Sequence, residues 1–588
     1  METISPEVTI PDLLQRHPHL RGVLDRYGLK GCGGELGPSE TIEFFSKTHG
    51  VDRDSLLEEL EAAVREPSLV PAGESYRPGL GDVIYRPFFV FGLFAAVVPG
   101  ALYGSYMLWK MLDGGIAGVP FNRMNAHAHA MVYGFVAMFI MGFSYQALPR
   151  FKHTSLWRPK LALLSFALMV GGLALRLSGE YFLWGENAIN NGWFAAGIAG
   201  TSLELAAVTI FATVIAVTLR RSGKERAVYE SYIYAAIFWM IFGLMGSMAH
   251  FVAIGVGPNP ITQIAVFQEP LRNAQILGMT AMVIFGVMLR LIPPVFGFSD
   301  PGEKLFKRWL VPLNVGILVL CISFILMMAS RRGMFEFNYR AASIVYSLSS
   351  LLVVAIFLRL SFGFRPFRAT TTSDRSVKFI RAAHLWFALA LLMLLFEPVY
   401  IVLFKGKFPH GFHGAMRHAT AVGFIAMMIV AVASKIGPTL NGRDTAKLTQ
   451  LWPVFVLLNL GLVIRVTAEI SSDYPDTLRP LLPISGVLLI AGLALWGVHM
   501  IRVIRPAPSA TPMTAQNVEI APHARVTLII ERWPGTLEVF ARHGFGLLQN
   551  PVLRRTIARN VTLEAACSIQ NVDIETLIKD LRQVAGDS

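Results

Sequence analysis

Residues 127 to 151 read HAHAMVYGFVAMFIMGFSYQALPRF, an apolar run that opens with two histidines. A helix needs about 20 apolar residues to cross the hydrocarbon core of a bilayer, so this stretch predicts a membrane helix. Because an ionisable side chain is costly inside a membrane span, the two histidines indicate a functional site.

Similar apolar runs recur along most of the chain, separated by Pro, Gly or clusters of charge. The chain is 54% hydrophobic and only 15% charged, a composition typical of a polytopic membrane protein and not of a soluble enzyme. We therefore predict an all-α bundle of about twelve spans.

Basic residues are concentrated in alternate loops, beginning with Arg150, Lys152, Arg158 and Lys160 after the second span. By the positive-inside rule, both termini are expected in the cytoplasm, although the loop SRRGMFEFNYR between spans seven and eight runs against the pattern. The start of the chain, METISPEVTIPDLL, does not resemble a signal peptide. Since topology accounts for the net charge of +13, we expect no nucleic-acid partner.

The two polar ends of the chain resemble each other. RHPHLRGVLDRYGLKG (16–31) parallels ERWPGTLEVFARHGFG (531–546), and TIEFFSKTHGVDRDSLLEEL (41–60) parallels TLEAACSIQNVDIETLIKDL (562–581). Gly50 and Asn571 occupy the same place, and both residue types tolerate a left-handed backbone. The predicted organisation is a small helical cytoplasmic domain (1–66), a linker (67–82), the membrane domain (83–504), a linker (505–520) and a second copy of the helical domain (521–588).

The first small domain resembles the helical domain that precedes the di-iron domain in ScdA-type iron-centre repair proteins, through the GCGG segment at 31–34 and the HGVD that follows. Where that domain often carries two adjacent cysteines, this chain has Gly31 and then Cys32. Only two other cysteines are present, and none forms a close pair, so neither a disulfide framework nor a CxxC metal site is supported. We favour docking, regulation or binding of a cytoplasmic protein partner for the end domains over a redox or metal role for Cys32.

Histidines mark the ends of several spans, and imidazole is a usual protein ligand for haem iron and copper. His127 and His129 are two residues apart, so on a regular helix they point about 200° apart and cannot both ligate one centre. For each of them, hydrogen bonding to water or lipid headgroups is the alternative. The candidates in the predicted spans or at their mouths are His127, His129, His250, His384, His413 and His418.

Three segments resemble the NnrS family, twelve-helix bacterial membrane proteins that contain haem and copper, are linked to nitric oxide metabolism and are distantly similar to the catalytic subunit of haem-copper oxidases. They are YRPFFVFGLFAAVVPGALY (85–103), the opening stretch at 127–151, and RHATAVGFIAMMIVAVASKIGPTLNGR (417–443). Ala130 departs from the family, many members of which have glutamate there. The sixth span lacks the histidine found in haem-copper oxidases, so we do not expect oxygen reduction with proton pumping.

The resemblance implies that His127, His129 and His418 are haem or metal ligands. His413, His250 and His384 are further metal candidates, and Arg290 is a candidate partner for haem propionates, with an ion pair as its alternative. We expect haem, with copper as a second candidate cofactor.

The leading hypothesis is a haem protein of the bacterial cytoplasmic (inner) membrane that binds or processes nitric oxide or a related small ligand and so protects against nitrosative stress. Whether it turns over a substrate is left open. The alternatives are a secondary transporter, for which twelve spans are common, and a membrane sensor or scaffold without cofactor.

Overall fold

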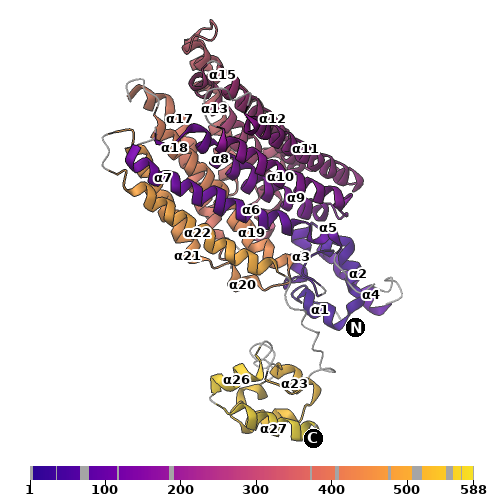
Figure 1. The fold of residues 1–588 in the computed structure, drawn as a ribbon. Helices are drawn as coiled ribbons and strands as arrows, with labels where there is room; N and C mark the ends of the chain where they lie inside the picture. The colour runs from indigo at the N-terminus through magenta and orange to yellow at the C-terminus, as the bar shows by residue number, and fades with distance from the viewer. Residues whose placement is uncertain are drawn as a thin grey trace. The chain divides into compact units, whose positions relative to one another are not determined.

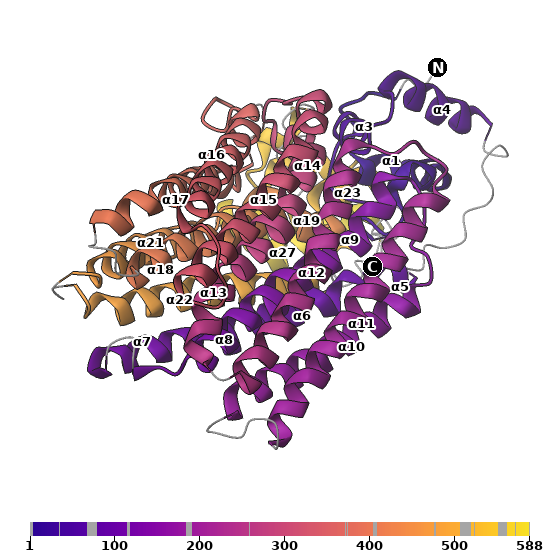
Figure 2. The same ribbon diagram turned by 90° about the horizontal axis from the view of Figure 1, so that it is seen from above.

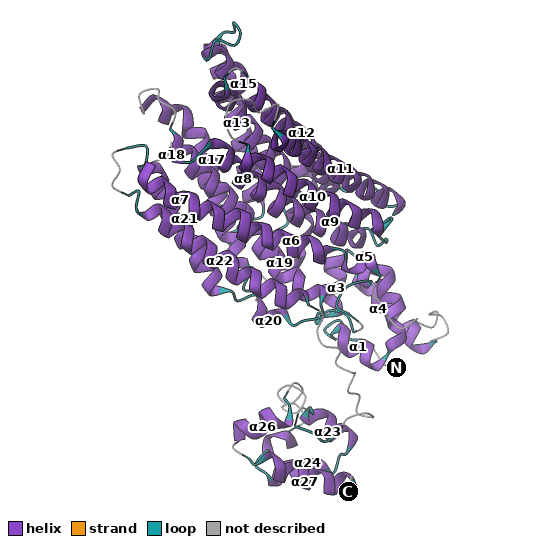
Figure 3. Ribbon diagram, in the orientation of Figure 1, coloured by secondary structure: helices purple, strands orange, loops and turns teal. Residues whose placement is uncertain are grey.

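The computed structural model describes residues 4–34, 36–66, 79–114, 118–183, 191–257, 259–370, 372, 374–403, 409–474, 478–505, 519–522, 524–550, 561–570 and 572–586. These residues form helices and connecting loops, and no sheet is present among them (Figure 3). The chain divides into two compact units, Met1–Arg505 and Pro506–Ser588. The linkers predicted at 67–82 and 505–520 lie largely outside the described residues, as does Asn571.

Twelve helices of the described chain are long and apolar enough to cross a membrane, which confirms the predicted all-α polytopic bundle. The first six spans are α5 (Leu80–Val83), α6 (Tyr85–Ala95), η4 (Ala96–Leu102) and α7 (Tyr103–Gly114); α8 (Phe121–His129), η6 (Ala130–Ala137) and α9 (Met138–Phe151); α10 (Pro159–Phe182); α11 (Gly192–Arg221); α12 (Val228–Val256); and α13 (Pro260–Asn273), η8 (Ala274–Ala281) and α14 (Met282–Phe296). The last six are α15 (Glu303–Arg331); α16 (Tyr339–Gly363); α17 (Val377–Leu403); α18 (His410–His418), η9 (Ala419–Ala426) and α19 (Met427–Leu440); α21 (Trp452–Ser471), preceded by the short α20 (Thr445–Leu448); and α22 (Leu481–Ile504).

Spans two, six and ten form the interior of the bundle. In the most apolar 18-residue stretch of each of these three spans, 83%, 72% and 72% of the residues are buried. The corresponding share in the other nine spans is 33–50%. Each of the three carries a π-helical segment, η6, η8 or η9, at mid-span. Since π-helical turns are frequent at functional sites, the inner helices are where a site is expected.

Asparagines begin three of the even-numbered spans. Asn191, Asn259 and Asn338 each accept a hydrogen bond from a backbone N–H of the following turn, at 3.0–3.1 Å. Such caps satisfy amides that would otherwise lack a partner at a helix start. They therefore mark where α11, α13 and α16 begin.

The outer spans pack as neighbouring pairs, of which α10 and α11 make the most extensive contact (Figures 1 and 2). Glycines allow this close approach. A Cβ atom added at Gly172 would lie 2.7 Å from the carbonyl oxygen of Gly200, and one added at Gly179 would lie 2.7 Å from the Cα of Gly197. The two backbones are therefore in direct contact, as in small-residue interfaces of other membrane helices.

The N-terminal domain lies against one end of the bundle, beside α5, α9 and α14 (Figure 1). It consists of α1 (Ile10–Arg16), η1 (Pro18–Leu20), α2 (Arg21–Leu24), η2 (Asp25–Leu29), α3 (Ile42–His49) and α4 (Arg53–Arg65). The Gly33 N–H donates to the Leu440 carbonyl at 3.1 Å, and Lys435 lies 3.8 Å from the Glu40 carboxylate. Backbone and side-chain contacts thus both hold the domain in place.

The C-terminal unit repeats the plan of the N-terminal domain. Its helices are α23 (Val526–Arg532), α24 (Thr536–Arg542), η11 (Gly546–Gln549), α26 (Leu563–Gln570) and α27 (Ile574–Ala585). Thr9 and Thr41 form an isolated antiparallel bridge in the first copy, and Arg525 and Thr562 form one in the second. Asp52 and Asp573 cap the last helix of their copies by accepting from the N–H three residues later, at 2.9 Å in both. The similar sequences therefore fold in the same way.

Candidate functional site

The second and tenth spans bring His127 and His418 together at the end of the bundle away from the N-terminal domain. Each lies in the short helix that opens its span, α8 or α18, just before a π-helical segment. His418 and Arg465 are close enough to His127 to interact with it electrostatically. Two spans far apart in sequence therefore contribute one histidine each to the same region.

Hydrogen bonds orient both imidazole rings in the same manner. His127 Nδ1 donates to the Gly100 carbonyl at 2.9 Å, and His418 Nδ1 donates to the Gly414 carbonyl at 2.9 Å with Glu469 Oε2 at 3.0 Å. A proton on Nδ1 leaves the Nε2 lone pair available, which is the state in which histidine binds a metal. In His418 that nitrogen accepts from Arg465 at 3.3 Å, a long bond that a metal would replace.

The first span provides the space around His127. A Cβ atom at Gly104 would lie 2.7 Å from Cε1 of the imidazole, so only glycine fits there. The neighbouring η4 segment contains Pro99 and presents the Gly100 carbonyl to His127. Gly104 thus lets the His127 ring approach the backbone of the first span, and Gly100 provides its hydrogen-bond acceptor.

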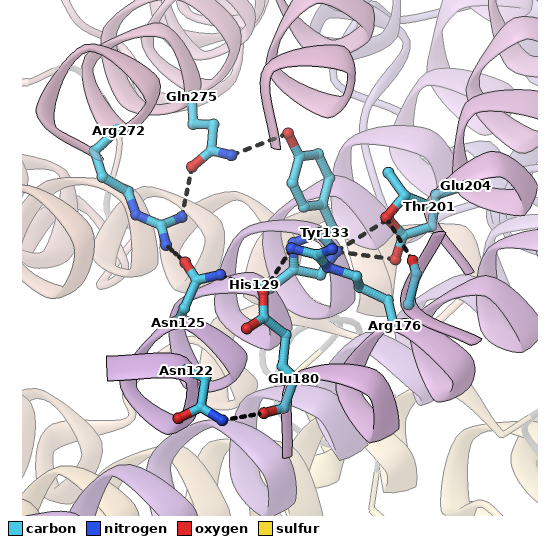
Figure 4. Close-up of polar contacts among 11 residues, drawn as sticks. Asn122, Asn125, His129, Tyr133, Arg176, Glu180, Thr201, Glu204, Arg272 and Gln275 are labelled. Atoms are coloured by element: carbon cyan, nitrogen blue, oxygen red, sulfur yellow. Dashed lines mark hydrogen bonds and ion pairs between the residues drawn. The ribbon is translucent and has the colours of Figure 1, made fainter. Parts of the chain in front are cut away.

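His129 points to different neighbours from those of His127. Its Nε2 lies 3.0 Å from both oxygens of Glu204 on α11, and its ring packs on Tyr133 with centroids 4.7 Å apart (Figure 4). His129 is 1% exposed and Glu204 is fully buried. A buried carboxylate needs such a partner, so Glu204 engages the His129 ring in this structure, and a haem or metal role for His129 stays a prediction.

A buried polar network extends from this region to the sixth span (Figure 4). Arg176 donates to Glu180 Oε1 at 2.6 Å, and Asn125 bonds the same carboxylate. The Asn125 side-chain oxygen accepts from Arg272 at 2.5 Å, and Arg272 also donates to Gln275 at 2.7 Å. Helices of the second, third and sixth spans are therefore linked through groups that a bilayer could not solvate.

His413 is paired with carboxylates at both ring nitrogens. Nε2 lies 3.0 Å from Glu397 Oε1, and Nδ1 lies 3.5 Å from Glu269 Oε2. Glu397 also accepts from the Tyr346 hydroxyl at 2.9 Å, and Glu269 also pairs with Arg417. The two carboxylates contact different nitrogens of the ring, so His413 bridges Glu397 and Glu269.

The remaining candidates lie apart from these groups. His384 Nδ1 donates to the Ile380 carbonyl at 2.8 Å within its own helix, and His250 packs edge-on against Phe121. Arg290 donates to the Thr48 carbonyl at 2.9 Å in the N-terminal domain. Arg290 therefore lies at the end of the bundle that contacts the N-terminal domain, whereas His127 and His418 lie at the other end. The sequence had suggested Arg290 as a partner for haem propionates.

Cys32 lines a cavity between the N-terminal domain and the bundle, walled by Phe44, Phe89, Phe151 and Leu440. Burial raises the pKa of its thiol, and the nearby Arg150 only partly offsets this effect. Since the thiolate is the reactive form of cysteine, a protonated thiol fits a packing role.

The residues around His127 and His418 fit a haem. Two imidazoles from separate helices, each with Nδ1 engaged, could hold the iron of such a group through Nε2, and Arg465 lies beside them. Among the described residues, no group of three or more His, Cys, Asp or Glu side chains is arranged to hold a metal ion. Copper at His413, His250 or His384 stays a prediction.

Sequence reasoning identified the histidines but not the neutral side chains that connect them. Asn125 and Gln275 are 5% exposed and fully buried, respectively, and bridge charged groups from different spans. Their only signal was a polar residue within an apolar stretch, near a histidine or an arginine. That signal does not show which partner each side chain has.

Comparisons with known proteins agree with this architecture. A family model described as NnrS protein matches residues 83–506, and one described as a domain of unknown function (DUF1858) matches residues 520–578. A heme-copper terminal oxidase, solved as a dimer by cryo-electron microscopy, superposes with a TM-score of 0.51 at 13% identity, covering 86% of this chain and 98% of that chain. At that identity the likeness shows the fold alone. No curated protein matches with significance, and the resemblance of residues 1–66 to the ScdA domain stays a prediction.

Proposed function

The chain belongs to the NnrS family, and on that premise we propose that it is a haem protein of the bacterial inner membrane that binds or processes nitric oxide or related nitrosyl species. Both termini lie in the cytoplasm in this proposal. It is supported by the convergence of His127 and His418 from the second and tenth spans. Copper is a second proposed cofactor.

The chain's own residues would hold the haem. His127 and His418 would hold it through Nε2, with the Gly100 carbonyl and Glu469 keeping Nδ1 engaged. Arg465, whose Nε is paired with Glu469, would release the His418 ring and could donate the N–H so freed to an acidic haem edge. When bound, the haem supplies an iron that takes up small diatomic ligands. Nitric oxide is small and neutral, so it can reach such a site from the bilayer.

Absorption spectra of the purified, detergent-solubilised protein test this proposal. We expect a Soret band in the wild type that shifts when nitric oxide is added to the reduced protein. His127→Ala and His418→Ala should each lose most of the bound haem, because each removes an imidazole that would hold it. His499→Ala is the control, since it removes a half-buried histidine from the twelfth span and should keep the band.

Two results would contradict the proposal. One is a folded wild-type protein that is colourless after haem has been supplied during expression. The other is a Soret band that persists unchanged in both His127→Ala and His418→Ala. A colourless folded protein would favour the alternative functions, a transporter or a sensor without cofactor.

A further inference from the structure

Arg272 is a buried guanidinium without a carboxylate partner. It is 5% exposed, and among the described residues no Asp or Glu oxygen lies within 4 Å of it. Its two hydrogen bonds go to the neutral amides of Gln275 and Asn125 (Figure 4). Because a guanidinium has five N–H donors, three remain for another acceptor.

Arg272 lines a small cavity between the sixth, ninth and tenth spans. Glu269, Asn273, Arg417 and Thr420 contribute polar groups, and Phe387, Leu391 and Leu394 of α17 form an apolar wall. The cavity volume of about 20 Å³ exceeds the roughly 10–15 Å³ needed for one water. The space therefore suits a group of two or three heavy atoms, either a small free molecule or the end of a larger one.

Two donors that line this cavity have no acceptor among the described residues. The side-chain amide nitrogen of Asn273 is buried and unbonded, and so is Nε of Arg417. Asn273 is only 6% exposed, so it cannot turn to bulk water. An unsatisfied buried donor is costly, and an acceptor in the cavity would remove that cost.

The charge of the cavity lining also favours an anion. Glu269 pairs with Arg417 and approaches His413 at 3.5 Å, so its charge is already matched. Arg272 is linked to Glu180 only through Asn125, and Glu180 is itself paired with Arg176. One positive charge among the lining residues is thus without a direct counter-charge.

We propose that this cavity binds a small planar oxyanion, with two oxygens on one atom, through the guanidinium of Arg272 and the side-chain amide of Asn273. Arginine matches such an anion because its parallel N–H groups can donate to both oxygens. The anion is either a free one, such as nitrite, or the carboxylate of a bound cofactor. The second source rests on the haem proposed above, whereas the first does not.

The test compares thermal unfolding of the full-length protein in sodium nitrite and in sodium chloride at equal ionic strength. We expect nitrite to raise the Tm of the wild type. Arg272→Gln and Asn273→Leu should need about tenfold more nitrite for the same rise, because each loses a hydrogen bond to the charged ligand. Arg86→Gln is the control, since Arg86 bonds Asn441 at the other end of the bundle.

The ratio of Soret to protein absorbance, measured on the same variants, separates the two sources. If nitrite leaves the wild-type Tm unchanged but Arg272→Gln and Asn273→Leu lose haem while Arg86→Gln keeps it, the anion is a cofactor carboxylate. If neither the rise in Tm caused by nitrite nor the haem content depends on Arg272 and Asn273, the inference is overturned.

Further variants keep the test decisive if Arg272→Gln does not fold. Arg272→Lys keeps the charge but loses the planar fork, and Asn273→Leu leaves Arg272 in place. The nitrite measurement can also be made on protein without haem. A colourless protein with an Arg272-dependent nitrite response would contradict the proposed haem function and support this inference.

Discussion

Some buried side chains in the interior of the bundle have a single partner that offsets the cost of their burial. Glu204 is fully buried, and its carboxylate has both oxygens 3.0 Å from His129 Nε2. Removing one member of such a buried pair leaves a charge that neither water nor lipid can solvate. The pair therefore links α8 to α11 as long as both members are present.

We expect His129→Ala to destabilise the protein by about 3–5 kcal/mol, because Glu204 then remains buried without its partner. The double variant His129→Leu with Glu204→Leu should recover much of that loss, since no buried charge is left. Thermal unfolding in detergent at neutral pH measures both. Losses that simply add in the double variant would show that the two residues do not act as a pair.

At the scale of helices, glycine position decides how closely two spans approach. Gly172 faces α11, where an added Cβ would lie 2.7 Å from the Gly200 carbonyl and 2.8 Å from Glu204 Cγ. Gly171, one residue earlier, has no atom within 4 Å of its added Cβ. Neighbouring glycines on one helix thus have different roles.

Gly172→Ala should destabilise the protein by about 1–3 kcal/mol, because the methyl group forces α10 and α11 apart. Gly171→Ala is the matched control and should be neutral or slightly stabilising, since alanine favours the helix. Thermal unfolding of the two variants side by side checks this. Equal Tm values would mean that α10 and α11 do not pack through Gly172.

At the scale of the whole first unit, docking of the N-terminal domain depends on a neutral histidine. His49 lies under the domain, and burial is the main reason that its pKa falls from 6.5 to about 3, with His153, Arg290 and Arg150 adding positive charge around it. Burial also lowers the pKa of His153.

Docking should therefore be strongest above pH 6.5 and weaken as the pH falls from 6.5 towards 3. The undocked domain exposes His49, which takes up a proton near its ordinary pKa, whereas the docked form resists protonation. The docking free energy should be weaker by about 2 kcal/mol near pH 5 than above pH 6.5. Hydrogen exchange at the Gly33 amide, which bonds the Leu440 carbonyl, measures docking after correction for intrinsic exchange.

His49→Gln provides the control for this pH effect. Gln570 occupies the corresponding place in the C-terminal copy, so the small domain accepts that residue. The variant should retain only the smaller pH dependence that His153 contributes. An unchanged response in His49→Gln would assign the effect to another group.

The sequence by itself determined the twelve spans, the repeated small domain and the segments that carry histidine. Apolar length fixes a membrane helix locally, because each span must satisfy its own backbone hydrogen bonds. The spacing of His127 and His129 also predicted that they face different neighbours, because two positions on one helix have fixed relative directions. These features need no knowledge of neighbouring helices.

Only the tertiary structure decided which residues meet. It brings His127 towards His418, pairs His129 with Glu204 and places Arg290 against the N-terminal domain. It also leaves Arg272 beside amides instead of carboxylates. A periodic sequence specifies how a side chain is oriented about its own helix axis, but its partner depends on how the spans pack around one another.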